Sequence, residues 1–165
     1  MENDDYFKLP KIIELTDYKG NFHLYLEAVY ALFKRDFIDN KPTYRGVPIH
    51  LKHCKLSQGK DATFWHMTSK GENEETREPD FRRLERIQWP APMINNSEQP
   101  YLKVWENTRG SNTNILILHN EENYLLVLRK AKDYIMPWTA YLIDYKSRKR
   151  KLIQEYENYI KSKER

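Results

Sequence analysis

At 165 residues, with 39% hydrophobic and 32% charged residues and 12 Tyr, 6 Phe and 4 Trp, the chain is too aromatic for a disordered polymer and too polar for a membrane protein. Residues 1–145 hold 20 Lys and Arg against 21 Asp and Glu, whereas residues 146–165 hold 8 against 3, so the basic excess behind the net charge of +4 lies at the end. No run reaches the roughly 18 apolar residues of a membrane span, and the acidic start differs from a signal peptide. The lone Cys54 excludes an internal disulfide. We therefore expect a cytoplasmic protein.

Residues 1–19 are interpreted as an N-terminal arm, and residues 20–39 have the spacing of an amphipathic helix. Its apolar positions recur every three or four residues, at Phe22, Leu26, Val29, Phe33 and Phe37. A turn is predicted at "NKPTYRGVP", and the partly alternating "VPIHLKHCKL" that overlaps it is typical of a strand.

The next segment, "DATFWHMTSK" at 61–70, fits a strand and a short helix equally well, because its apolar run is too short to show a period. After an acidic loop, Asp80 is predicted to cap a two-turn helix whose inward side chains are Phe81, Leu84 and Ile87. Two prolines, Pro90 and Pro92, are expected to end it.

From residue 101 the pattern changes to alternation, which predicts an antiparallel meander of three or four strands. The expected strands are 101–107, 114–120, 124–130 and 134–144, although Pro137 and Trp138 can bend the last one. Residues 146–165 return to helical spacing and form an expected basic C-terminal helix. The fold class is therefore α+β, in one domain of residues 1–165 with helices packed on one antiparallel sheet.

Two histidines and a cysteine lie close together in "HLKHC", at His50, His53 and Cys54. A zinc site usually takes three or four ligands, and no second cluster supplies the rest, so a surface strand explains them better. The chain also lacks the glycine-rich phosphate loops of nucleotide-dependent enzymes and the "GxSxG" of serine hydrolases. We therefore expect no metal and no cofactor.

His66 is the histidine that stands in an aromatic run, after Phe64 and Trp65. Such a histidine is more often a half-buried structural residue than a catalyst. A helix with three arginines follows, at Arg82, Arg83 and Arg86. Ordinary surface ion pairs with nearby carboxylates would also explain them, at about 0–1 kcal/mol each.

The predicted strands add Arg129, which ends an apolar run, and Thr139 and Tyr141, which point to one face because they lie two residues apart. Histidine, arginine and aromatic residues together suit metal-independent cleavage of RNA by its own 2′-hydroxyl. Histidine titrates in the useful range, arginine holds phosphate, and aromatic rings stack on bases.

Several motifs in order resemble the phage and mobile-element branch of the barnase, EndoU, colicin and RelE-like nuclease superfamily. They are "GVP" at 46–48, "FWHMTS" at 64–69, "PDFRRLERIQW" at 79–89, "VW" at 104–105, "YLLVLR" at 124–129 and "TAY" at 139–141. The resemblance spans roughly residues 20–156. It implies N-terminal helices followed by a four-stranded antiparallel sheet, with an active site on the exposed sheet face.

The resemblance also implies a metal-independent endoribonuclease, of the kind found as a toxin or phage-related effector. Its implied catalytic residues are His66, Arg86, Arg129, Thr139 and Tyr141. Substrate binding is expected from Lys70, Arg77, Arg82, Arg83 and Trp89. The implied partners are RNA and a cognate antitoxin or immunity protein, with no membrane.

Two other classes of function fit the same residues. In a nucleic-acid-binding module without catalysis, the basic end and exposed aromatic residues would bind RNA in a salt-sensitive manner without cutting it. In an accessory factor, the aromatic surface would dock a protein partner instead. An inactive member that kept the fold is a third reading.

Overall fold

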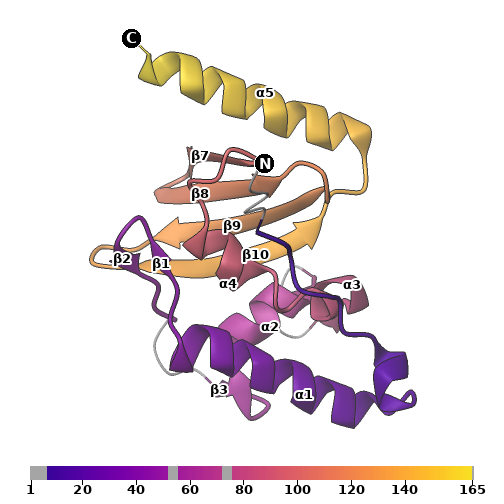
Figure 1. Ribbon diagram of the computed structural model, residues 1–165. Helices are drawn as coiled ribbons and strands as arrows, with labels where there is room; N and C mark the ends of the chain where they lie inside the picture. The colour runs from indigo at the N-terminus through magenta and orange to yellow at the C-terminus, as the bar shows by residue number, and fades with distance from the viewer. Residues whose placement is uncertain (1–6, 52–55, 72–75, 165) are drawn as a thin grey trace, which may run out of the picture.

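The computed structural model describes residues 7–51, 56–71 and 76–164. Its largest sheet has four antiparallel strands in the order β10-β9-β8-β7, a meander in which each strand pairs with the next along the chain. Figure 1 shows this sheet between a layer of helices and the C-terminal helix α5. The strands are β7 (Leu102–Arg109), β8 (Asn112–His119), β9 (Tyr124–Lys130) and β10 (Ile135–Leu142). The predicted α+β class and four-stranded antiparallel sheet are confirmed.

One face of the sheet packs on the helices that precede it. These helices are α1 (Phe22–Lys34), α2 (Ala62–Thr68), α3 (Phe81–Glu85) and α4 (Pro90–Asn95). A short 3-10 helix, η1 (Leu15–Tyr18), comes before α1, and a π-helical turn, η2 (Arg35–Asp39), extends it. Side chains such as Phe33, Phe64 and Leu126 are fully buried between these helices and the sheet, and they form the larger core.

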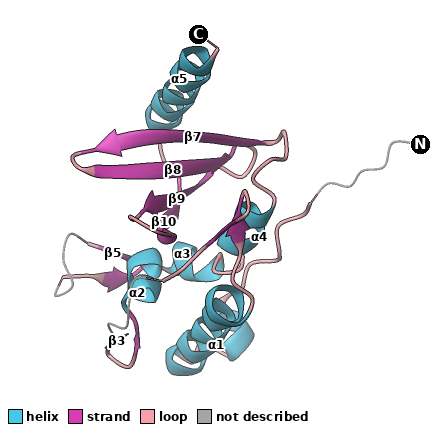
Figure 2. Cartoon of the chain, turned by 90° about the vertical axis from the view of Figure 1, so that its left-hand side faces the viewer, coloured by secondary structure: helices cyan, strands magenta, loops and turns pink. Residues whose placement is uncertain are grey.

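The other face of the sheet packs on α5 (Lys146–Lys163). Leu152 of α5 is buried against a smaller core that contains Trp105, Leu116 and Leu125 from three strands. Figures 1 and 2 both show α5 on the side of the sheet opposite to α1. The sheet face that the resemblance leaves exposed is therefore partly covered, because these apolar strand residues need a packing partner.

Helix α1 buries Val29 and Phe33 as predicted, but the buried stripe differs from the predicted one at its start. Phe22 is 36% exposed, whereas Tyr25 is fully buried and its hydroxyl donates to the backbone carbonyl of Ile13, 2.8 Å away. Tyrosine can fill such a core position because its hydroxyl reaches a partner. Asn21 caps the helix by accepting from the backbone N–H of Leu24.

The segment after α1 contains short strands in place of the one predicted. Strand β1 (Thr43–Tyr44) pairs with β2 (Val47–Pro48), and Ile49 then bridges Ile135 at the edge of the large sheet. Residues 52–55, which include His53 and Cys54, lie outside the described residues. Two more two-residue pairs flank α2: β3 (Leu56–Ser57) with β4 (Lys60–Asp61), and β5 (Ser69–Lys70) with β6 (Glu78–Pro79).

The segment whose state the sequence left open is helical, with Phe64 and Met67 of α2 buried. Pro90 does not simply end the arginine helix, because it also begins α4. Proline suits a first helical position, where the missing N–H would have no partner within the helix.

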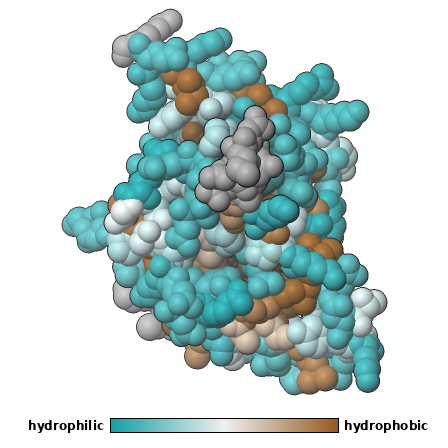
Figure 3. Space-filling view, in the orientation of Figure 1, coloured by the Kyte–Doolittle hydropathy of each residue, from teal (hydrophilic) through white to brown (hydrophobic). Residues whose placement is uncertain are grey.

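In the view of Figure 3, hydrophilic side chains cover most of the surface, and hydrophobic ones gather in the helical layer below the sheet. Among the residues described, none of the helices is both long and apolar enough to cross a lipid bilayer.

Candidate active site

His66 on α2 is held against β10 by the main chain of that strand. Its Nδ1 lies 2.6 Å from the carbonyl oxygen of Trp138, and the imidazole and indole rings are 4.3 Å apart between centroids. A carbonyl oxygen can only accept a hydrogen bond, so in the neutral ring Nδ1 carries the proton. Nε2 is therefore the nitrogen that can accept a proton.

The surroundings of His66 favour its neutral form. Burial lowers the pKa of His66 from its usual value of 6.5, the bond to Trp138 opposes this, and the positive charges of Arg77, Arg129 and Arg83 lower the pKa further. Neutral imidazole predominates at pH 7 under these conditions. His66 is consequently suited to accept a proton, the role of a general base.

Arg83 on α3 points toward the same part of β10. One terminal nitrogen, Nη1, donates to the carbonyl of Ser69 at 2.9 Å and to the hydroxyl of Thr139 at 3.3 Å, and the guanidinium lies 5.5 Å from the ring centre of Tyr141. Asp80 caps the helix below it by accepting from the backbone N–H groups of Arg82 and Arg83. The predicted cap is confirmed, and it fixes the base of the arginine side chain.

Arg129 on β9 reaches the site from the sheet. Its guanidinium lies 3.5 Å from the centre of the Trp138 ring, and its Nε donates to Asn114 Oδ1 at 3.2 Å. Asn114 donates in turn to Asn107, which donates to Glu155 of α5. This row of hydrogen bonds crosses three strands and fixes one edge of the guanidinium, while its positive charge stays beside His66.

A shift in the pairing register of β10 places its later side chains, such as Thr139, on the sheet face that α5 covers. Pro137 pairs with Leu128 and Thr139 pairs with Val127, so Trp138 is an extra residue, a β-bulge. A residue inserted into a strand exchanges the faces of all later side chains. The bulge therefore puts Thr139 on the α5 face, with the Trp138 carbonyl turned to His66, and the predicted bend is confirmed.

The structure thus brings together most of the residues that the sequence indicated. His66, Arg83, Arg129, Thr139 and Tyr141 gather around β10, where Tyr141 also accepts a hydrogen bond from Arg148 of α5. Arg77 stands close enough for its charge to act on His66. Lys70 is exposed on β5, and Arg82 is exposed and paired with Asp144 at 2.6 Å.

Two predicted site residues lie elsewhere. Trp89 is only 6% exposed, belongs to the larger core and donates from Nε1 to the carbonyl of Pro10, so it cannot stack on a base. Arg86 lies over the ring of Trp89, at 5.1 Å, and donates to the carbonyl of Arg82. The last turn before Trp89 directs Arg86 toward the core and Arg83 toward β10. Arg83 therefore occupies the place that the sequence gave to Arg86.

Two contributions were missed in the sequence, namely the carbonyl of Trp138 and the buried amide of Asn114. Asn114 has a sequence signal in its position, because it stands directly before the apolar run of β8. The hairpin register also places Asn107, Asn114 and Arg129 in one row across the sheet. The Trp138 carbonyl has no such signal, since α2 and β10 are 72 residues apart along the chain.

Neither a group of metal ligands in the described residues nor a similar protein gives further information about this site. Within the described ranges, no three His, Cys, Asp or Glu residues gather as a metal site would require. Comparisons of the chain with protein-family models, with curated proteins and with solved structures found no match. The function is therefore inferred from the geometry of the chain itself.

Proposed function

We propose that this protein is a metal-independent endoribonuclease of the barnase and RelE-like kind, with its active site between α2, α3 and the β9–β10 edge of the sheet. The observation that carries the proposal is that His66, oriented by the Trp138 carbonyl, lies near two arginines, Arg83 and Arg129, whose charges lower its pKa. RNA contains the nucleophile that such a site needs, since its 2′-hydroxyl adjoins the bond to be cut.

In the proposed reaction, Nε2 of His66 removes the proton of the 2′-hydroxyl. The 2′ oxygen attacks the adjacent phosphorus, the bond to the 5′ oxygen breaks, and that oxygen takes up a proton as it leaves. The products are a 2′,3′-cyclic phosphate and a 5′-hydroxyl. A positioned base of this kind contributes about 10²–10⁴-fold to a rate.

The two arginines face the negative charge that develops on the phosphate. Guanidinium groups keep their charge and donate paired hydrogen bonds to phosphate oxygens. Both arginines donate to neutral oxygen acceptors, on Ser69, Thr139 and Asn114, and these contacts leave the positive charges in place. Asp80, 3.7 Å from Arg83 Nε, offsets part of the charge of Arg83. The Tyr141 hydroxyl is the group we assign to proton donation to the leaving oxygen.

The test is incubation of the purified protein with total RNA in EDTA, followed by analysis of the fragment ends. We expect cleavage that leaves 2′,3′-cyclic phosphates and is at least about 10²-fold slower in His66→Gln, because an amide cannot act as the base. His23→Gln is the matched control, because His23 is exposed on α1. Its activity should equal that of the wild-type protein.

Two results would overturn the proposal. Equal cleavage by the wild-type protein and His66→Gln would remove His66 from the reaction. Intact RNA with salt-sensitive binding would instead favour the binding module without catalysis.

A further inference from the structure

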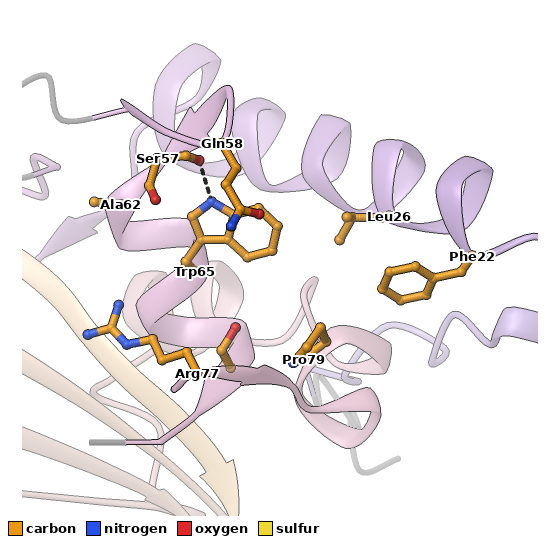
Figure 4. A pocket seen from close by; sticks show the side chains of 9 residues that line it. Phe22, Leu26, Ser57, Gln58, Ala62, Trp65, Arg77 and Pro79 are labelled. Carbon is orange, nitrogen blue, oxygen red and sulfur yellow. Dashed lines mark hydrogen bonds between the residues drawn. The ribbon is translucent and has the colours of Figure 1, made fainter. Parts of the chain in front are cut away.

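A cavity of about 180 Å³ adjoins the candidate active site on the other side of α2. It is smaller than the roughly 300–1,000 Å³ pockets that hold drug-sized ligands, so it suits a single small ring system. Consecutive residues of α2 serve the two places: His66 faces β10, and Trp65 lines the cavity. Figure 4 shows the cavity with Trp65 near its centre and Arg77 at one side.

Part of the cavity wall is apolar and includes a fixed aromatic ring. Trp65 Nε1 donates to the carbonyl of Ser57 at 2.7 Å, which sets the plane of the indole. Phe22, Leu26 and Pro79 complete the apolar lining. The 36% exposure of Phe22 departs from the predicted helix stripe and places an aromatic ring at the surface beside the cavity.

Polar groups stand at the same cavity. Gln58 lines it from the turn between β3 and β4, and its amide can donate and accept at once, as the edge of a base requires. Arg77 also lines it, and the charge of Arg77 acts on His66. Ser69 lines the cavity too and its carbonyl holds Arg83. Ser69 and Arg77 thus belong to the cavity and also act on residues of the active site.

We propose that this cavity binds one nucleobase of a single-stranded RNA, next to the phosphate that is cleaved. Trp65 stacks on the base, Gln58 hydrogen-bonds to its edge, and Arg77 binds the phosphate that leads from the base to the active site. Stacking on an aromatic side chain accepts any base, so Gln58 gives the preference. This inference rests on the proposed function, since the active site supplies the position of the neighbouring phosphate.

The test measures binding of the four trinucleotides rA3, rC3, rG3 and rU3 to the His66→Gln protein by calorimetry, so that cleavage does not interfere. In this background, Leu26→Trp fills the cavity with a second indole. Leu24→Trp is the matched control, because Leu24 lies two residues away on α1 and is exposed. Gln58→Gly removes the amide at a position where φ is 50°, which glycine adopts without strain.

We expect the parent protein to prefer one trinucleotide. Leu26→Trp should weaken that complex by about 5- to 150-fold, the loss of one stacked base, whereas Leu24→Trp should not. Gln58→Gly should bind all four with similar affinity. Thermal melts show whether the variants fold. If Leu26→Trp does not fold, Gln58→Gly remains as the second test of the cavity.

Unchanged affinity and unchanged preference in the folded variants would overturn the inference, as would a parent protein that binds none of the four. Cleavage of RNA by the wild-type chain decides the proposed function separately. Cleavage without an effect of the cavity variants defeats only the base site. Cavity-dependent binding without cleavage defeats only the nuclease.

Discussion

At the scale of single residues, the Trp138 carbonyl and the arginines around His66 determine what this histidine can do. The carbonyl fixes the proton on Nδ1, and burial with the nearby positive charges keeps the ring neutral. Both effects serve proton acceptance, and they come from different elements of the fold. The charge environment is therefore open to test by single substitutions.

The pH dependence of cleavage should show this environment. Because burial and positive charge lower the pKa of His66, kcat/KM should fall on the acid side only below about pH 6.5. Arg77→Gln removes one of those charges, so the pKa should rise and the midpoint of the acid limb should move to higher pH. Arg45→Gln, in the β1–β2 turn, should not move it. A midpoint unaffected by Arg77→Gln would mean that its charge does not act on the base.

Two tryptophans that look alike in the sequence should behave differently. Trp89 belongs to the larger core, so Trp89→Ala should lower the free energy of unfolding by about 3–5 kcal/mol. Trp138 is partly exposed and stacks with Arg129, so Trp138→Ala should cost less stability but should slow cleavage. Urea denaturation and kcat/KM measure the two effects. Equal stability losses would show that Trp138 is also a core residue.

At the scale of elements, the short helix α3 and the bulge in β10 orient the side chains of the candidate site. The five-residue α3 depends on the Asp80 cap, and Asp80 also lies 3.7 Å from Arg83 Nε. The bulge in β10 sets which face Thr139 and Tyr141 occupy. A small local change in either element would therefore redirect these side chains.

The cap of α3 should therefore matter for activity more than a cap elsewhere. Asp80→Ala and Asn21→Ala each remove a side-chain cap, from α3 and α1, and each should cost about 0.5–2 kcal/mol of stability. Only Asp80→Ala should lower kcat/KM, because it releases Arg83. Full activity in both variants would show that the cap of α3 is not needed to position Arg83 for cleavage.

At the scale of the whole molecule, the sheet is buried on both faces, by the early helices on one and by α5 on the other. The site lies toward the β9–β10 edge, where side chains from α2, α3 and the sheet meet. Two histidines are partly or fully enclosed by these layers, His66 near the site and His119 at the end of β8. The lowered pKa values of these two histidines make the stability of the fold depend on pH.

Stability should fall as the solution becomes acidic. Burial lowers the pKa of both histidines in the folded state, so between pH 6.5 and their folded values the unfolded chain binds more protons. The stability they contribute is present above pH 6.5 and is lost as pH falls through that window. His119→Gln should reduce the slope of unfolding free energy against pH just below pH 6.5, without changing cleavage. An unchanged slope would assign the pH dependence to other groups.

Local patterns in the sequence determined the α+β class, the four strands and the helical spacing of α1 and α5, because alternation and three-to-four spacing follow directly from which face each element buries. They also indicated His66, Arg129, Thr139 and Tyr141, whose residue types suit phosphate chemistry. Asp80 was identified as a cap because capping involves only near neighbours.

Only the tertiary structure decided which arginine joins His66, because one turn of chain separates Arg83 from Arg86 and the direction of each depends on what α3 packs against. Packing also made 62–68 a helix, buried Tyr25 instead of Phe22 and placed α5 over the second sheet face. The contact between His66 and the Trp138 carbonyl joins residues 72 positions apart. Such contacts arise from the arrangement of elements in space, which no short stretch of sequence specifies.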